Sequence, residues 1–117
     1  MRHHNNNRKF GRDKKGRNAL LKGLVLALIA HGKIKTTEAK AKEVRSMIEK
    51  MITKAKLGTL ASRRLIISRL YNRKTEADKL IETIASKYKN NKGGYTRITK
   101  LPRRLGDASK MAIIEFI

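Results

Sequence analysis

The amino-acid sequence predicts an α+β fold in which four helices pack with a small three-stranded sheet, preceded by a basic N-terminal arm. Apolar residues recur at helical spacing up to about residue 88, and alternation replaces that spacing after Gly93 and Gly94. Residues 1–17 hold seven Lys or Arg and few apolar side chains, so burial cannot order this stretch. We expect one domain, with an extended arm over 1–12 and a compact body over 13–117.

The first two helices have clear start and stop signals. Asp13 is a good N-cap for a helix from Lys14 to His31, and Gly32 suits the left-handed residue that ends it. Thr37 is the expected N-cap of the second helix, which runs to about Lys56. Its apolar residues follow one face: Ala41, Val44, Ile48, Met51, Ile52 and Ala55.

Two further helices are predicted before the pattern changes. Thr59 is expected to cap the third, which extends to about Tyr71 and contributes five core residues: Leu60, Leu65, Ile66, Ile67 and Leu70. Thr75 and Asp78 resemble a capping box for the fourth helix. Its apolar stripe comprises Ala77, Leu80, Ile81, Ile84, Ala85 and Tyr88.

Three segments have the composition of strands. β-Branched residues favour a short strand over 33–37, residues 95–100 alternate, and residues 111–117 are apolar enough to be buried on both faces. Because two strands rarely stand alone, we expect all three in one sheet. The segment from Leu101 to Lys110 is too long for a tight turn and suits an exposed basic loop.

The net charge of +21 indicates a polyanionic partner, with nucleic acid the first candidate and an anionic membrane surface the second. No residue pattern predicts an enzyme, a small-molecule substrate or a cofactor. The absence of cysteine excludes thiolate chemistry, and His3, His4 and His31 lack the converging partners that a metal site needs. The apolar run from Leu24 to Ala30 is too short to span a bilayer, so we expect a soluble cytoplasmic protein.

The basic residues fall into two groups. Lysines scattered over the helices, such as Lys50, Lys54, Lys79 and Lys87, are typical of a solvated face, and so are the helix acids. Clustered cations without neighbouring acids are the candidates for nucleic-acid backbone contacts, because the planar guanidinium binds phosphate bidentately. These are Arg8, Lys9, Arg12, Lys14, Lys15, Arg17, Arg63, Arg64, Arg103 and Arg104.

Several stretches resemble the bacterial large-subunit ribosomal protein seventeen family. The similarity covers essentially the whole chain. Its most specific part is the run Gly-Gly-Tyr-Thr-Arg-Ile at 93–98, and the other matching parts are Met1-Arg2-His3, Ile34-Lys35-Thr36-Thr37, Ala41-Lys42-Glu43, Arg63-Arg64-Leu65, Gly106-Asp107, Met111-Ala112 and Ile114-Glu115.

This resemblance implies a structural constituent of the large ribosomal subunit that binds ribosomal RNA near the peptide exit side and stabilises its folded form during assembly. It also implies a cytoplasmic, ribosome-bound location and neighbouring large-subunit proteins as partners, among them protein thirty-two. The RNA contacts that it implies are Arg2, His3, Arg8, Arg12, Arg17, Lys35, Lys42, Arg63, Arg64, Arg97, Lys100 and Arg104.

Two other functions remain open on the sequence alone. Short helices and a high charge are compatible with a helix-turn-helix DNA regulator, although the helices that follow the junctions at Gly58 and Asn72 hold much apolar surface. A membrane-active cationic helix is the other alternative, and the strand pattern after Lys33 argues against it.

Overall fold

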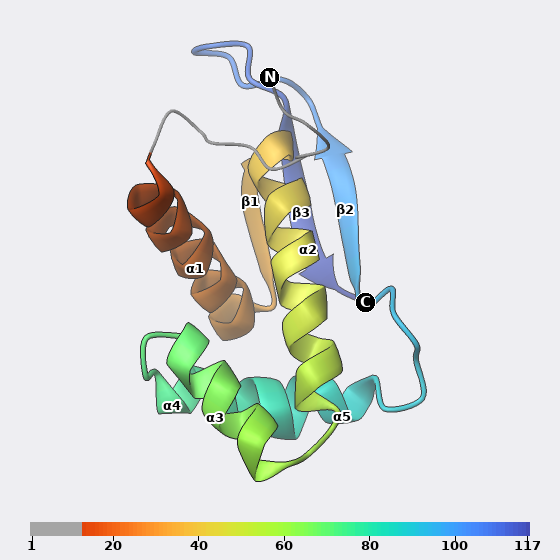
Figure 1. Cartoon of the computed structure of the whole chain (residues 1–117). Coiled ribbons are helices and arrows are strands. Elements are labelled where there is room, and N and C mark those ends of the chain that lie inside the picture. Colours follow the sequence, from red (N-terminus) through yellow and green to blue (C-terminus); the bar gives the residue numbers. More distant parts are fainter. Residues whose placement is uncertain (1–12) are drawn as a thin grey trace, which may run out of the picture.

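The computed structural model describes residues 13–117 and confirms the α+β prediction (Figure 1). Two long helices lie on one face of a three-stranded antiparallel sheet, and the other helical segments pack at the lower end of these two helices in Figure 1. The opposite face of the sheet is not covered by any helix of the described part of the chain. The predicted arm over 1–12 falls outside the described residues.

Helices α1 (Lys14–His31) and α2 (Glu38–Ala55) begin where the sequence predicts. The Asp13 carboxylate accepts a hydrogen bond from the Gly16 amide at 2.8 Å, and the Thr37 hydroxyl accepts one from Lys40. Gly32 ends α1 at a φ of 81°, a left-handed value that favours glycine. The two helices pack together over the sheet (Figure 1) and bury the predicted apolar face of α2.

The sheet has the strand order β1-β3-β2, with β3 in the centre. β1 (Lys33–Thr37) and β2 (Thr96–Leu101) each pair antiparallel with β3 (Met111–Phe116). The register aligns Ile34, Ile114 and Ile98 on the face that the helices cover. Alternate residues therefore point to the uncovered face, where Lys33, Lys35 and Arg97 lie, while Lys100 has the same parity as Ile98 and pairs with Glu38 of α2.

Helix α3 (Leu60–Arg69) starts after the predicted Thr59 cap but buries fewer residues than expected. Ser62, Ile66 and Leu70 follow one another at intervals of four and face the core. Leu60 and Leu65 lie on other faces of the helix and are exposed, so their assignment to the core is wrong.

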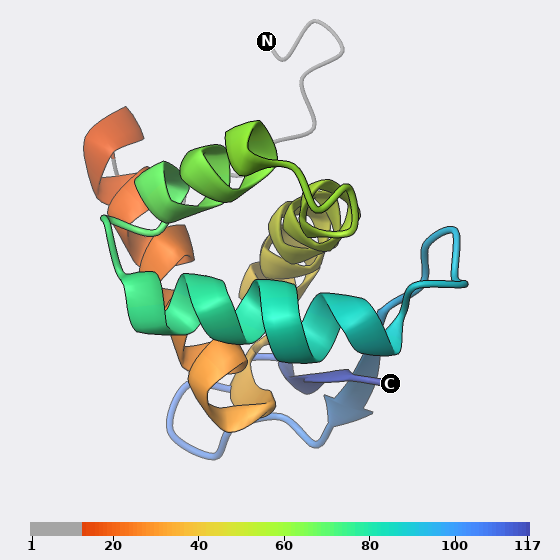
Figure 2. The same cartoon turned by 90° about the horizontal axis from the view of Figure 1, so that it is seen from below.

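The fourth predicted helix is a continuous run of α4 (Lys74–Asp78), the π-helix η1 (Lys79–Ile84) and α5 (Ala85–Lys87), which crosses the end of α2 (Figure 2). The predicted capping box is wrong. The helix begins at Lys74, one residue before Thr75, and its N-cap residue Arg73 makes no side-chain cap hydrogen bond within the described residues. The Asp78 carboxylate pairs with Arg63 instead.

Candidate nucleic-acid interface

The uncovered face of the sheet presents a row of charged side chains. Lys33 and Arg97 lie on either side of Glu115 in the register, and both cations are exposed. Arg97 donates from Nη2 and Nε to one Glu115 oxygen, at 2.7 and 3.1 Å. This pairing holds the Arg97 guanidinium against the sheet. Lys35, which lies two residues after Lys33 on the same face of β1, has no ion pair within residues 13–117.

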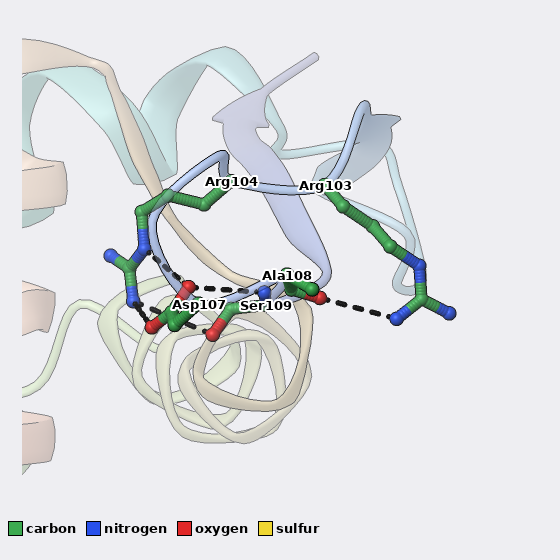
Figure 3. Close-up of polar contacts among 5 residues, drawn as sticks. All are labelled: Arg103, Arg104, Asp107, Ala108 and Ser109. Atoms are coloured by element: carbon green, nitrogen blue, oxygen red, sulfur yellow. Dashed lines mark hydrogen bonds and ion pairs between the residues drawn. The ribbon is translucent and has the colours of Figure 1, made fainter.

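The loop between β2 and β3 holds two arginines by its own hydrogen bonds (Figure 3). Arg104 donates to both Asp107 carboxylate oxygens, at 3.0 and 2.7 Å, and Arg103 donates to the Ala108 carbonyl at 3.1 Å. The Ala108 amide closes the loop on the Arg104 carbonyl, and Ser109 donates to Asp107. The loop is therefore ordered by its own hydrogen bonds, which hold the Arg103 and Arg104 guanidinium groups in defined positions.

Electrostatics reinforce this loop. The hydrogen bonds that Arg104 donates hold the pKa of the Asp107 carboxyl far below its usual range, with a smaller contribution from Ser109. The same pairing raises the pKa of Arg104. Both groups are therefore charged at any physiological pH.

The structure brings Lys35 together with the two loop arginines. All three line one hollow at the end of the sheet, over apolar side chains from Leu101, Pro102 and Met111. Leu105 also lines the hollow and is fully exposed. Figure 1 shows that this loop projects beyond the sheet at the end opposite α3, so the loop and α3 offer two separate basic surfaces.

Lys42 and Lys100 share one carboxylate at the junction of α2 and the sheet. Glu38 lies 3.0 Å from the Lys42 ammonium and 3.8 Å from that of Lys100. Its pKa is lowered, first by the hydrogen bond from Lys42 and then by the nearby lysine charges. Lys110 lines a second hollow together with Glu38 and Lys42, and its backbone carbonyl accepts a hydrogen bond from the Glu38 amide. Among the described residues, this corner therefore has Lys42, Lys100 and Lys110 near one acid.

The premise that the arginine clusters lack acid partners is wrong at two positions. Arg63 pairs with Asp78 of α4, and Arg104 pairs with Asp107. Arg64, the neighbour of Arg63, is exposed and forms no ion pair within the described part of the chain. Lys14, Lys15 and Arg17 occupy the first turn of α1, while Arg2, His3, Arg8, Lys9 and Arg12 lie outside the described residues.

Sequence reasoning passed over four cations that the structure places beside the predicted ones. Lys33 shares a strand face with Lys35, which a period of two could have indicated. Lys110 joins the Glu38 corner, and Lys50 and Arg69 line a groove with Arg17. No local signal reveals these three, because their neighbours come from other elements.

The described residues contain no cluster of three His, Asp or Glu side chains that could hold a metal ion. No helix in the same part of the chain is long and apolar enough to cross a membrane. The arrangement consists of arginine and lysine side chains on a rigid support, which is suited to binding anions by charge and hydrogen bonding.

Comparison with known proteins identifies the family. A family model described as "Ribosomal protein L17" matches residues 20–117. The chain belongs to this family. It is 48% identical over 117 residues to the large ribosomal subunit protein bL17 of Campylobacter jejuni subsp. doylei, covering 100% of this chain and 99% of that relative.

Two other L17 proteins are similar to the same degree. The bL17 protein of Persephonella marina is 51% identical over 118 residues, which cover 100% of this chain and 95% of that relative. The bL17 protein of Mycoplasmopsis synoviae is 50% identical over 113 residues, which cover 92% and 94%. The resemblance predicted from the sequence is thereby confirmed, and these relatives are named as ribosomal proteins, not as enzymes.

Proposed function

We propose that this L17-family chain is a structural constituent of the large ribosomal subunit that binds ribosomal RNA and stabilises its folded form during assembly. The main observation behind the proposal is the loop between β2 and β3, in which Arg103 and Arg104 are held by hydrogen bonds within the loop. These two arginines and Lys35 line one hollow at the end of the uncovered sheet face. The membership of a ribosomal-protein family supports the same conclusion.

The proposed binding mode is charge neutralisation on a rigid scaffold. Folded RNA is recognised mostly by its shape and its sugar-phosphate backbone, which suits guanidinium groups held at fixed places. Aromatic residues make up 4% of the chain, so stacking of bases on a broad aromatic platform is not the basis of the proposal. Paired arginines such as Arg97 and Arg104 then contribute orientation as much as charge.

The proposed RNA-binding surface combines the body with the arm. We assign residues 1–12 as an extended basic arm and residues 13–117 as the body. The RNA-binding residues in this proposal are Arg2, His3, Arg8, Lys9, Arg12, Lys14, Lys15, Arg17, Lys35, Lys42, Arg63, Arg64, Arg97, Lys100, Arg103 and Arg104. The proposed partners are large-subunit ribosomal RNA and neighbouring proteins of that subunit, including protein thirty-two, in the bacterial cytoplasm.

Salt-dependent binding tests this function. We expect the chain to bind purified large-subunit ribosomal RNA with an affinity that falls steeply between low and high salt, because each phosphate that is bound releases counterions. Replacing Lys35, Arg103 and Arg104 with Ala should flatten the plot of log affinity against log salt by about 0.7–0.9 for each phosphate that the variant no longer binds.

The matched control removes charge elsewhere. Lys89 and Lys92 are exposed and form no ion pair within the described residues, so the Lys89→Ala, Lys92→Ala variant should keep nearly the wild-type slope. Duplex DNA and anionic vesicles serve as competitors. Equal affinity for duplex DNA would favour the regulator alternative, tight vesicle binding in physiological salt would favour the membrane alternative, and a flat salt dependence would refute the proposed mechanism.

A further inference from the structure

A groove between three helices gathers cations that are distant in the sequence. Its walls come from α1 (Arg17, Asn18), α2 (Ser46, Lys50) and α3 (Arg69), and its volume is about 280 Å³. Leu21 and Met47 provide its apolar floor. Figure 1 shows α1 and α2 side by side with α3 at their lower end, away from the loop that presents Arg103 and Arg104.

The charge of this groove is unbalanced. Arg17, Lys50 and Arg69 form no ion pair within residues 13–117, although most of the other predicted arginines of the body have acid partners. Glu43 is the one acid among the lining residues that the structure describes, and it is itself engaged in an interaction. Three cations face one carboxylate, so the groove attracts an anion.

The neutral groups narrow the choice of anion. Asn18 and Ser46 are exposed and place an amide and a hydroxyl beside the cations. A guanidinium matches the paired oxygens of a phosphate, an ammonium adds a point charge, and the amide and hydroxyl can bond a ribose 2′-hydroxyl. The apolar floor offers a surface for the sugar. This combination fits the backbone of RNA better than a carboxylate or a free inorganic anion.

We propose that the groove between α1, α2 and α3 binds a phosphodiester of ribosomal RNA, as a second binding site separate from the sheet and its loop. This inference rests on the proposed function and adds a site to it. From the sequence alone, Lys50 is interpreted as part of a solvated helix face. The groove instead assigns Lys50 to RNA binding, together with Arg69. The chain then holds RNA on two sides of its body and brings two RNA segments together.

The test compares two double variants that each remove two exposed cations: Lys50→Ala with Arg69→Ala, and Lys89→Ala with Lys92→Ala as the control. We expect the groove variant to bind large-subunit RNA about tenfold or more weakly, with a salt slope lower by about one to two. The control should differ little from the wild-type chain. The charge-conserving variant Lys50→Arg, Arg69→Lys should keep most of the slope.

A footprint separates this site from the loop. Hydroxyl-radical protection of the bound RNA should disappear from one segment with the groove variant and from a different one with the Arg103→Ala, Arg104→Ala variant. Equal thermal midpoints would show that the variants are folded. If the wild-type chain binds RNA but the groove variant matches the control in slope and footprint, the groove inference is wrong alone. If the wild-type chain binds no ribosomal RNA, the proposed function fails with it.

Discussion

Glu49 is an acid whose removal should destabilise the fold. One of its carboxylate oxygens accepts the Tyr95 amide at 3.0 Å and the Thr96 hydroxyl at 3.4 Å, at the point where the chain enters β2. Tyr95 is 1% exposed, so water cannot easily replace this acceptor. A hydrogen bond to a charged group contributes about 1.5–3 kcal/mol, and an unsatisfied buried donor costs about as much.

The Glu49→Ala variant should therefore lose about 1.5–3 kcal/mol in the free energy of unfolding, reduced by a few tenths through the better helix propensity of Ala. With a typical dependence of about 1–3 kcal/mol per molar urea, the midpoint of urea unfolding should fall by about 1 M. Glu49→Gln keeps an acceptor and should cost roughly 1 kcal/mol.

Circular dichroism during urea titration measures both variants. A Glu49→Ala midpoint equal to that of the wild-type chain would show that the Tyr95 amide finds another partner. Equal destabilisation by Ala and Gln would show that the charge matters and the hydrogen bond does not. Either result would refute the role assigned to this carboxylate.

Three other perturbations have defined outcomes. Ile114→Ala should cost about 2–5 kcal/mol in urea unfolding because Ile114 is fully buried in the central strand, while Ile113→Ala on the uncovered face should cost clearly less. The lowered pKa of Asp107 means that its pairing is complete above the ordinary value of 3.8 and is lost only as pH falls further. The Ser109 amide resonance should thus stay nearly constant from about pH 7 to 3, and a transition centred near 3.8 would contradict the pairing. Arg17→Ala should reduce incorporation into large subunits, measured by sedimentation, more than Lys87→Ala, and equal or reversed effects would refute that ranking.

Local chemistry explains why the element boundaries could be predicted. Asp13, Thr37 and Thr59 each cap a helix through their own side chain, and this interaction depends on residues only three positions away. Tertiary packing, by contrast, determines which apolar side chains are buried and which side chains pair across elements. Leu60 and Leu65 have core-like side chains, but α3 presents another face to its neighbours. Thr75 lies inside α4, which begins at Lys74, and Asp78 pairs with Arg63 of α3.

The sequence predicts the kind of site that we propose, but it could not predict how its residues are arranged. Charge and clustered arginines indicate a polyanion-binding surface without any knowledge of the fold. The partners of these arginines are invisible in the sequence, because Arg63 and Asp78 lie 15 positions apart and Arg97 and Glu115 lie 18 apart. The meeting of Arg17, Lys50 and Arg69 likewise depends on how three helices pack.

The acids of such a basic chain have a specific place in the proposed function. Exposed ion pairs contribute little to stability, so a stabilising effect alone is a weak explanation of Arg97–Glu115 and Arg104–Asp107. In the proposed function, each pair lowers the charge offered to RNA but holds a flexible side chain in one orientation, which reduces the entropy cost of binding. Cations such as Lys35 and Arg69, which form no ion pair within residues 13–117, would supply charge to RNA without that restraint. It follows that removing an acid such as Asp107 would raise the net charge and still weaken shape-specific binding, whereas a surface that worked by charge alone would bind RNA more tightly.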